Sequence, residues 1–152
     1  EIGCGPGAAL RDVASRVTGG FVAGIDASDL MVRQAVRRNR RAIQQRRVEV
    51  RLASMSAIPY PDDNFDKVFG TNSIQFSRAV SSDLREVGRV LRPGGLAAFS
   101  IQPIWKGGTD TTARETVRNL AGAMRDAGFV NCRTDEKASW PRAIVCASGR
   151  WR

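Results

Sequence analysis

The chain opens with Glu1-Ile2-Gly3-Cys4-Gly5-Pro6-Gly7, and this stretch decides how the rest is interpreted. Glycine allows a backbone to turn tightly and to approach a ligand closely. A run with helical spacing follows, with Leu10 and Ala14 on one face. The turn therefore precedes a helix N-terminus, where unpaired N–H groups can face an anionic ligand.

An acidic residue ends the next apolar segment. Residues 21–25 form a short apolar run that is typical of a buried strand, and Asp26 follows it directly. A carboxylate about 20 residues after a glycine turn is placed to accept hydrogen bonds from ribose hydroxyls. The pair predicts an adenosine-type ligand at the carboxyl ends of the strands, although each part alone also fits a tight turn or a helix cap.

Helical and strand patterns alternate along the remaining chain. We expect one helix from Ser28 or Asp29 through Ile43, a second from Ser82 or Asp83 to the Pro93-Gly94-Gly95 turn, and a third from the Thr112-x-x-Glu115 capping box to Gly128. We expect strands at 48–52, 66–69, 96–101, 129–134 and 143–147. This alternation predicts one α/β domain over residues 1–152, with a mainly parallel Rossmann-like sheet and helices on both faces.

Composition excludes several kinds of chemistry. The 152 residues include no histidine and three well-separated cysteines, Cys4, Cys132 and Cys146. A Cys/His zinc site, a Ser-His-Asp triad and an imidazole general base are therefore excluded. No apolar run is long enough to span a bilayer, and we expect a cytoplasmic protein with no metal.

Four segments in order resemble the class I S-adenosylmethionine-dependent methyltransferases. They are the glycine turn with Glu1, the segment Ile25-Asp26-Ala27-Ser28 followed by Met31, the loop at 53–62, and residues 84–95 with Pro93-Gly94-Gly95. The strand at 65–68 followed by Asn72-Ser73-Ile74 is also similar to that family's fourth strand. The resemblance covers the whole chain and implies S-adenosylmethionine as cofactor.

The resemblance also implies a site and a strand order. Glu1 would meet the methionine amino end, Asp26 the ribose, and Ala27 and Met31 the adenine. The full implied set is Glu1, Gly3, Cys4, Gly5, Asp26, Ala27, Met31, Ser54, Met55, Thr71 and Asn72. Many members have aspartate where Ser54 stands, and a hydroxyl accepts a hydrogen bond more weakly.

The implied strand order is 3-2-1-4-5-7-6, and the first strand would end at Glu1. Because the chain begins there, we expect a sequence that lacks its N-terminal strand and helices. That strand would be central in the sheet, and without it the neighbouring strands would leave rows of backbone N–H and C=O groups without partners.

Methyl transfer from a sulfonium needs alignment more than a general base. No carboxylate is singled out as a base, so the catalytic residue stays unknown and the acceptor unidentified, with a small molecule expected. A nicotinamide-dependent enzyme using Gly3-x-Gly5-x-x-Ala8 and an inactive remnant are alternatives. Pro6 in the glycine turn is evidence against the nicotinamide-dependent alternative.

Net charge is concentrated in one segment. Residues 33–47 contain seven arginines and no acid, and without them the +9 of the chain falls to +2. An RNA-directed methyltransferase would use this segment to contact phosphates. A solvated helix face is the favoured interpretation, because no aromatic residue is interleaved for base stacking.

Overall fold

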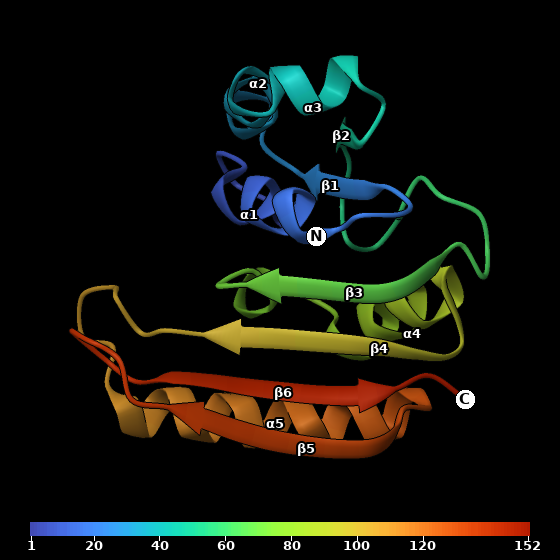
Figure 1. Ribbon diagram of the computed structural model, residues 1–152. Coiled ribbons are helices and arrows are strands. Elements are labelled where there is room, and N and C mark those ends of the chain that lie inside the picture. Colours follow the sequence, from blue (N-terminus) through green and yellow to red (C-terminus); the bar gives the residue numbers. More distant parts are fainter. The chain divides into compact units, whose positions relative to one another are not determined.

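The computed structural model describes residues 1–152 as two compact units, Glu1–Pro59 and Tyr60–Arg152. The first unit contains α1 (Ala8–Arg16), β1 (Val22–Asp26), α2 (Asp29–Arg38), α3 (Arg40–Gln44) and β2 (Val48–Leu52). The second contains β3 (Phe65–Thr71), a 3-10 turn at Ile74–Phe76, α4 (Val80–Val90), β4 (Leu91–Ile101), α5 (Asp110–Ala127), β5 (Val130–Lys137) and β6 (Ile144–Arg150). Figure 1 shows these elements along the chain.

In the first unit, β1 and β2 pair in parallel, with Val22 opposite Val48 and Asp26 opposite Leu52. The buried core consists of Leu10, Ala14, Val22 and Val48, so the apolar faces of α1 and both strands meet. Four of the five β1 residues are buried, as expected for a short apolar run in a parallel sheet. Because β1 and β2 are parallel, their carboxyl ends, at Asp26 and Leu52, lie side by side.

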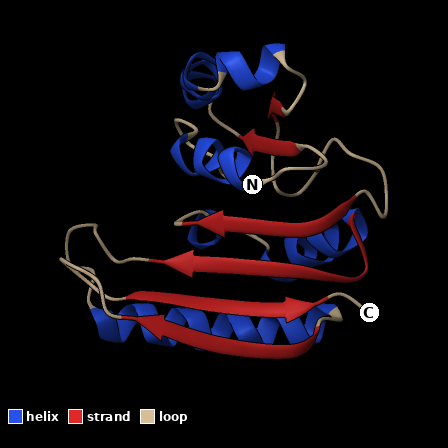
Figure 2. Cartoon of the chain, in the orientation of Figure 1, coloured by secondary structure: helices blue, strands red, loops and turns tan.

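In the second unit, the four strands follow the order β3-β4-β6-β5. The β3–β4 pair is parallel, and β6 runs antiparallel to both of its neighbours. Helices α4 and α5 contact each other and pack on one face of this sheet (Figure 2). Phe99, Leu84 and Met124 are among the fully buried side chains between these layers.

The fold class predicted from the sequence is confirmed. Strands β1 and β2 correspond to the expected neighbours 2 and 3, and β3-β4-β6-β5 to the expected 4-5-7-6. Two of the strand pairs are antiparallel, so the sheet of the second unit is mixed. No helix combines the length and the apolar character that crossing a bilayer requires.

The expected single helix through Ile43 was wrong, because the structure has two helices that meet at Asn39. Asn39 is 2% exposed, and its side-chain amide donates hydrogen bonds to the carbonyls of Ala35 and Gly7. A side chain that bonds the backbone in this way competes with continuation of the helix.

Three predicted element starts also need correction. Helix α4 begins at Val80 rather than at Ser82 or Asp83. The capping box of α5 uses Thr109 and Thr112, each bonding the other's backbone N–H, instead of Thr112 and Glu115. Strand β4 begins at Leu91, so the Pro93-Gly94-Gly95 turn lies inside it.

Candidate functional site

The glycine turn lies beside the carboxyl end of β1. The Ile25 N–H donates to the Glu1 carbonyl at 3.0 Å, and the Cys4 N–H donates to the Ile25 carbonyl at 2.9 Å. Ile2 and Ile25 form a parallel bridge. Residues 1–4 therefore run alongside β1 before the chain turns into α1.

Asp26 connects the turn to the end of β1. One carboxylate oxygen accepts the Gly5 N–H at 2.8 Å, and the other accepts the Ser28 N–H at 2.9 Å. Each carboxylate oxygen has a second lone pair, so both can still accept from a ligand hydroxyl. Gly5 has a φ of 51°, and a Cβ built there would meet nothing within 4 Å. The backbone at Gly5 therefore faces open space next to a half-buried carboxylate.

Position 7 requires glycine because, unlike at Gly5, there is no room for a Cβ. Its φ is 75°, and a Cβ at this position would lie 2.6 Å from Nδ2 of Asn39 and 2.9 Å from Cα of Ala35. Gly7 is the N-cap of α1 and provides no side chain to bind the first N–H groups of that helix. Unsatisfied N–H groups at a helix N-terminus favour a negatively charged group nearby.

Glu1 has an unusual carboxyl group. Its Oε2 atom is buried and has no hydrogen-bond partner. Burial raises the pKa of Glu1 to about 7, while the N-terminal ammonium and a backbone hydrogen bond from Leu10 act in the opposite direction. The buried ammonium itself donates to the Ala23 carbonyl at 2.6 Å. A buried carboxylate oxygen without a partner suits a cationic or hydrogen-bond-donating ligand group.

The Cys4 side chain is buried beside β1. Burial raises the pKa of the Cys4 thiol to about 12, with the nearby Glu1 and Asp26 carboxylates adding to the effect. A protonated thiol is a poor nucleophile and a poor metal ligand. The Cys4 side chain instead lies against Gly24, where a Cβ would approach its Cβ to 3.1 Å.

The residues predicted to contact adenine lie around the ends of β1 and β2. Ala27 is exposed, and the N–H of half-buried Met31 donates to the Ser28 hydroxyl at 3.4 Å. The N–H of Ala53 donates to the Asp26 carbonyl at 3.0 Å, which holds the start of the next loop at Asp26.

Ser54 and Met55 follow in that loop, with Ser54 exposed and Met55 half-buried. The Ser54 hydroxyl accepts the Ser56 N–H at 3.2 Å. This hydroxyl is therefore already engaged in a local turn, although its exposure leaves it accessible to a ligand.

Thr71 and Asn72 belong to the second unit, so their part in the same site stays a prediction. Thr71 ends β3, and its hydroxyl accepts from Ser100 on the neighbouring strand at 3.3 Å. Asn72 follows with a φ of 48°, and its side-chain oxygen accepts the Gln102 N–H at 2.8 Å. The structure places these two residues at the carboxyl end of β3.

Sequence reasoning missed two residues at the end of α2, Arg38 and its C-cap Asn39, that support the glycine turn. Asn39 donates to the Gly7 carbonyl at 3.0 Å, and the Arg38 guanidinium donates to the Pro6 carbonyl at 2.9 Å. The available signal was an asparagine within a helical pattern, a residue that favours helix ends. These contacts give Arg38 and Asn39, which both lie within residues 33–47, a structural role.

The arginine-rich segment does not form the continuous face that a single helix would give. Arg33 pairs with Asp29 on its own helix. Arg47 lies beyond α3 and donates to the carbonyls of Ala14 and Val17 at 2.6 and 2.7 Å. The segment therefore includes structural arginines as well as solvated ones.

Comparison with known proteins matches these features to one family. The family model described as "Methyltransferase domain" matches residues 1–99. The uncharacterized methyltransferase YdaC of Bacillus subtilis is 27% identical over 150 residues, which cover 99% of this chain and 81% of that protein.

Two further matches extend the comparison. The malonyl-[acyl-carrier protein] O-methyltransferase of Halorhodospira halophila is 34% identical over 128 residues, which cover 84% of this chain and 39% of that protein. The chain thus spans about two fifths of the length of this relative. The crystal structure of a SAM-dependent methyltransferase from Aquifex aeolicus superposes with a TM-score of 0.76 at 22% identity, covering 99% of this chain and 80% of that one, and supports the fold.

Proposed function

The chain belongs to the methyltransferase domain family, and from this premise we propose that it binds S-adenosylmethionine and transfers the methyl group to a small-molecule acceptor. The observation that supports the proposal most is the meeting of Glu1, Gly5 and Asp26 at one edge of the parallel β1–β2 pair. These residues offer a buried carboxylate oxygen, an open backbone and a strand-end acid. Together they suit a ligand that has an ammonium group and a ribose.

The residues of the first unit fit the cofactor. The unpartnered Oε2 of Glu1 would accept from the methionine ammonium, and the open space at Gly5 would admit the amino-acid portion. Asp26 would accept from the ribose hydroxyls while it keeps its bonds to Gly5 and Ser28. The backbone of Gly3 and Cys4 would also lie close to the amino-acid portion of the cofactor.

The adenine and reacting ends are assigned by the resemblance. Ala27 and Met31 would pack on the adenine ring, and Ser54 and Met55 would lie at its edge. Thr71 and Asn72 would lie beside the reacting end. Ser54 can offer a hydroxyl where a carboxylate would bind the adenine amino group more strongly, so we expect moderate affinity.

When bound, the sulfonium cofactor supplies both the electrophilic methyl group and the leaving group. The chain contributes binding and orientation, and positioning of this kind lowers a barrier by roughly 7–11 kcal/mol in favourable systems. Because the sequence contains no histidine, no imidazole takes up a proton from the acceptor. An acceptor atom with a free lone pair or existing negative charge therefore suits this site best.

The contacts and composition of the arginine segment favour a small-molecule acceptor over a nucleic acid. Arg33, Arg38 and Arg47 are engaged within the chain. Aromatic residues are absent from residues 29–47, so base stacking has no platform there.

Calorimetric titration with S-adenosylmethionine and with NAD⁺ tests the proposal. We expect saturable binding of S-adenosylmethionine and none of NAD⁺ at the same concentrations. Binding of NAD⁺ alone would instead support the nicotinamide-dependent alternative. Binding of neither would support an inactive remnant.

A further inference from the structure

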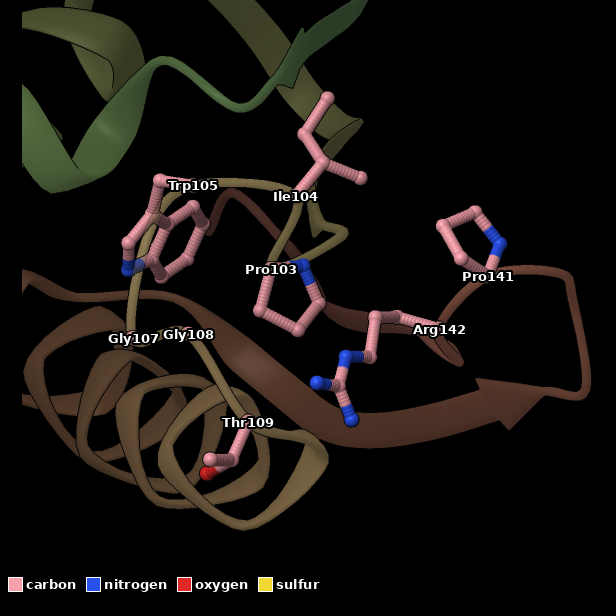
Figure 3. Close-up of a pocket in the computed structure, with 8 residues that line it drawn as sticks. All are labelled: Pro103, Ile104, Trp105, Gly107, Gly108, Thr109, Pro141 and Arg142. Atoms are coloured by element: carbon pink, nitrogen blue, oxygen red, sulfur yellow. The ribbon is translucent and has the colours of Figure 1, made fainter.

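A cavity of about 340 Å³ lies within the second unit, between the segment that follows β4 and the segment that precedes β6. Pro103, Ile104, Trp105 and Gly108 line one side of it, and Pro141 and Arg142 line the other. Figure 3 shows these side chains around the opening. Its volume falls within the range of pockets that hold small organic ligands.

The walls of the cavity combine apolar side chains with polar groups, and two of the large apolar side chains are exposed to solvent. Pro103 is fully buried, whereas Ile104 is 64% exposed and Trp105 is 46% exposed. Large apolar side chains grouped at a concave surface favour an apolar ligand, because covering them removes that surface from water.

The loop that presents Trp105 is held in shape by its own backbone. The Gly108 N–H donates to the Trp105 carbonyl at 3.0 Å, and the Ile104 N–H donates to the Gln102 carbonyl at 2.8 Å. A Cβ on Gly108 would lie 2.9 Å from the Pro103 carbonyl oxygen and 3.0 Å from Cε2 of Trp105. The absence of a side chain at Gly108 therefore lets the indole lie close to the loop.

Arg142 gives the cavity a positive charge. Its guanidinium group points toward Pro103 and Thr109 in Figure 3. Arg114 and Arg133 in the same unit pair with Glu136 and Asp135, but no ion pair joins Arg142 to a carboxylate. A guanidinium beside apolar side chains such as those of Trp105 and Pro103 is well suited to a planar carboxylate or to a phosphate group.

Hydrogen bonds connect this cavity to the residue predicted beside the reacting end. The Asn72 side-chain oxygen accepts the Gln102 N–H at 2.8 Å. The Gln102 side-chain amide donates in turn to the Arg142 carbonyl at 3.0 Å. The carboxyl end of β3 and the wall formed by Arg142 are thus joined through one residue.

We propose that this cavity binds the methyl acceptor, and that the acceptor is a small apolar molecule with an anionic group that pairs with Arg142. The apolar part lies against Trp105 and Pro103, and the carboxylate or phosphate lies at the guanidinium. The identification of the ligand as the acceptor rests on the proposed function, whereas the preference for an apolar anion rests on the cavity alone.

The test uses the full chain and three probes that share a naphthalene ring: 1-naphthaleneacetate, 1-naphthyl phosphate and the neutral 1-naphthaleneacetamide. Two-dimensional NMR follows the indole N–H resonances of Trp105 and Trp151. Trp151 packs against Phe129 at a ring-centroid distance of 5.0 Å and does not line the cavity. We expect at least one anionic probe to shift the Trp105 resonance without shifting that of Trp151, and to bind about ten-fold more tightly than the amide.

Two arginine variants complete the design. Arg142→Gln should reduce the affinity for the anionic probe to within about two-fold of that for the amide. Arg118→Gln, at an exposed position on α5 outside the cavity lining, should leave the preference intact. The stronger of the two anionic probes identifies carboxylate or phosphate as the preferred group.

Equal affinity for acid and amide, an unmoved Trp105 resonance with every probe, or a preference that survives Arg142→Gln would overturn the inference. The probes are titrated without S-adenosylmethionine, and cofactor binding is measured separately. Loss of cofactor binding with an intact anion preference would therefore count against the proposed function and not against the cavity's specificity.

Discussion

The backbone N–H of Gly5 donates a 2.8 Å hydrogen bond to Oδ2 of Asp26. This contact joins the glycine turn to the end of β1, across 21 residues of sequence. It orients the Asp26 carboxylate and at the same time fixes the open backbone at Gly5. The proposed cofactor site depends on this pair more than on any other contact of the first unit.

Replacement of Asp26 should weaken cofactor binding. We predict that Asp26→Ala lowers the affinity for S-adenosylmethionine by about ten- to a hundred-fold, because hydrogen bonds to a charged group contribute about 1.5–3 kcal/mol. Calorimetry measures the affinity, and a thermal melt reports whether the fold persists. Asp12→Ala, at an exposed position on α1, is the matched control and should leave the affinity unchanged. Affinity within two-fold of wild type for a folded Asp26→Ala would refute a ribose-binding role.

Binding of the cofactor should depend on pH through Glu1. Its pKa is raised to about 7 by burial, so the carboxylate is mostly protonated at pH 6 and mostly ionised at pH 7.5. An ammonium ligand prefers the ionised form, and we predict affinity about five- to ten-fold weaker at pH 6 than at pH 7.5.

Glu1→Gln provides the comparison, because the amide does not titrate. This variant should bind more weakly at pH 7.5 and show little change between the two pH values. A slope that persists unchanged in Glu1→Gln would assign the pH dependence to another group.

The same shift has a consequence for stability. The pKa of Glu1 is about 7 in the folded chain and takes the usual value of 4.5 in the unfolded chain. Between pH 4.5 and pH 7, the Glu1 carboxyl group is therefore protonated in the folded chain and ionised in the unfolded chain. The contribution of Glu1 to stability is therefore full below pH 4.5 and is lost as the pH rises through about 7. The Asp26 carboxylate and the N-terminal ammonium are the charged groups that act on Glu1.

Gly7 should not tolerate a side chain. Its φ of 75° strains any L-residue, and a Cβ would lie within 2.9 Å of the Ala35 backbone. We predict that Gly7→Ala destabilises the chain by about 2–4 kcal/mol, the sum of a left-handed conformation and an overpacked contact. Gly19→Ala, where a Cβ meets nothing within 4 Å, should change the free energy of unfolding by less than about 1 kcal/mol. Urea denaturation measures both, and equal effects would disprove the packing argument.

Two arginines of the basic segment should differ in their effect on stability. Arg47 donates to the carbonyls of Ala14 and Val17 at the end of α1, where a cation also complements the helix dipole. We predict a loss of about 1 kcal/mol for Arg47→Ala and less than about 0.5 kcal/mol for exposed Arg37→Ala. Chemical denaturation distinguishes them. An indistinguishable pair would mean that the contacts of Arg47 add no net stability.

Prediction from the sequence was most successful where the spacing of apolar residues clearly matched one type of secondary structure. The apolar run before Asp26 became β1, and the helical spacing around Leu10 became α1. The stop at Gly128 is confirmed, with a left-handed φ of 115° at the end of α5. Local patterns of this kind depend on neighbours in sequence, which the sequence itself supplies.

Prediction was wrong where distant contacts decide the outcome. The break at Asn39 depends on the carbonyl of Gly7, 32 residues earlier. The cavity at Arg142 depends on a loop that folds back at Gly108, and neither residue stands out in the sequence. Contacts of this length are set by tertiary packing, which overrides local preference.

The most direct test of the account is a two-dimensional amide NMR titration of the chain with S-adenosylhomocysteine, the stable product form of the cofactor. We predict saturable shifts of the backbone resonances of Gly3, Gly5 and Asp26, with those of Val117 and Leu120 in α5 unmoved. Unchanged resonances of the glycine turn at millimolar ligand, or shifts confined to other parts of the chain, would contradict a cofactor site at Gly5 and Asp26.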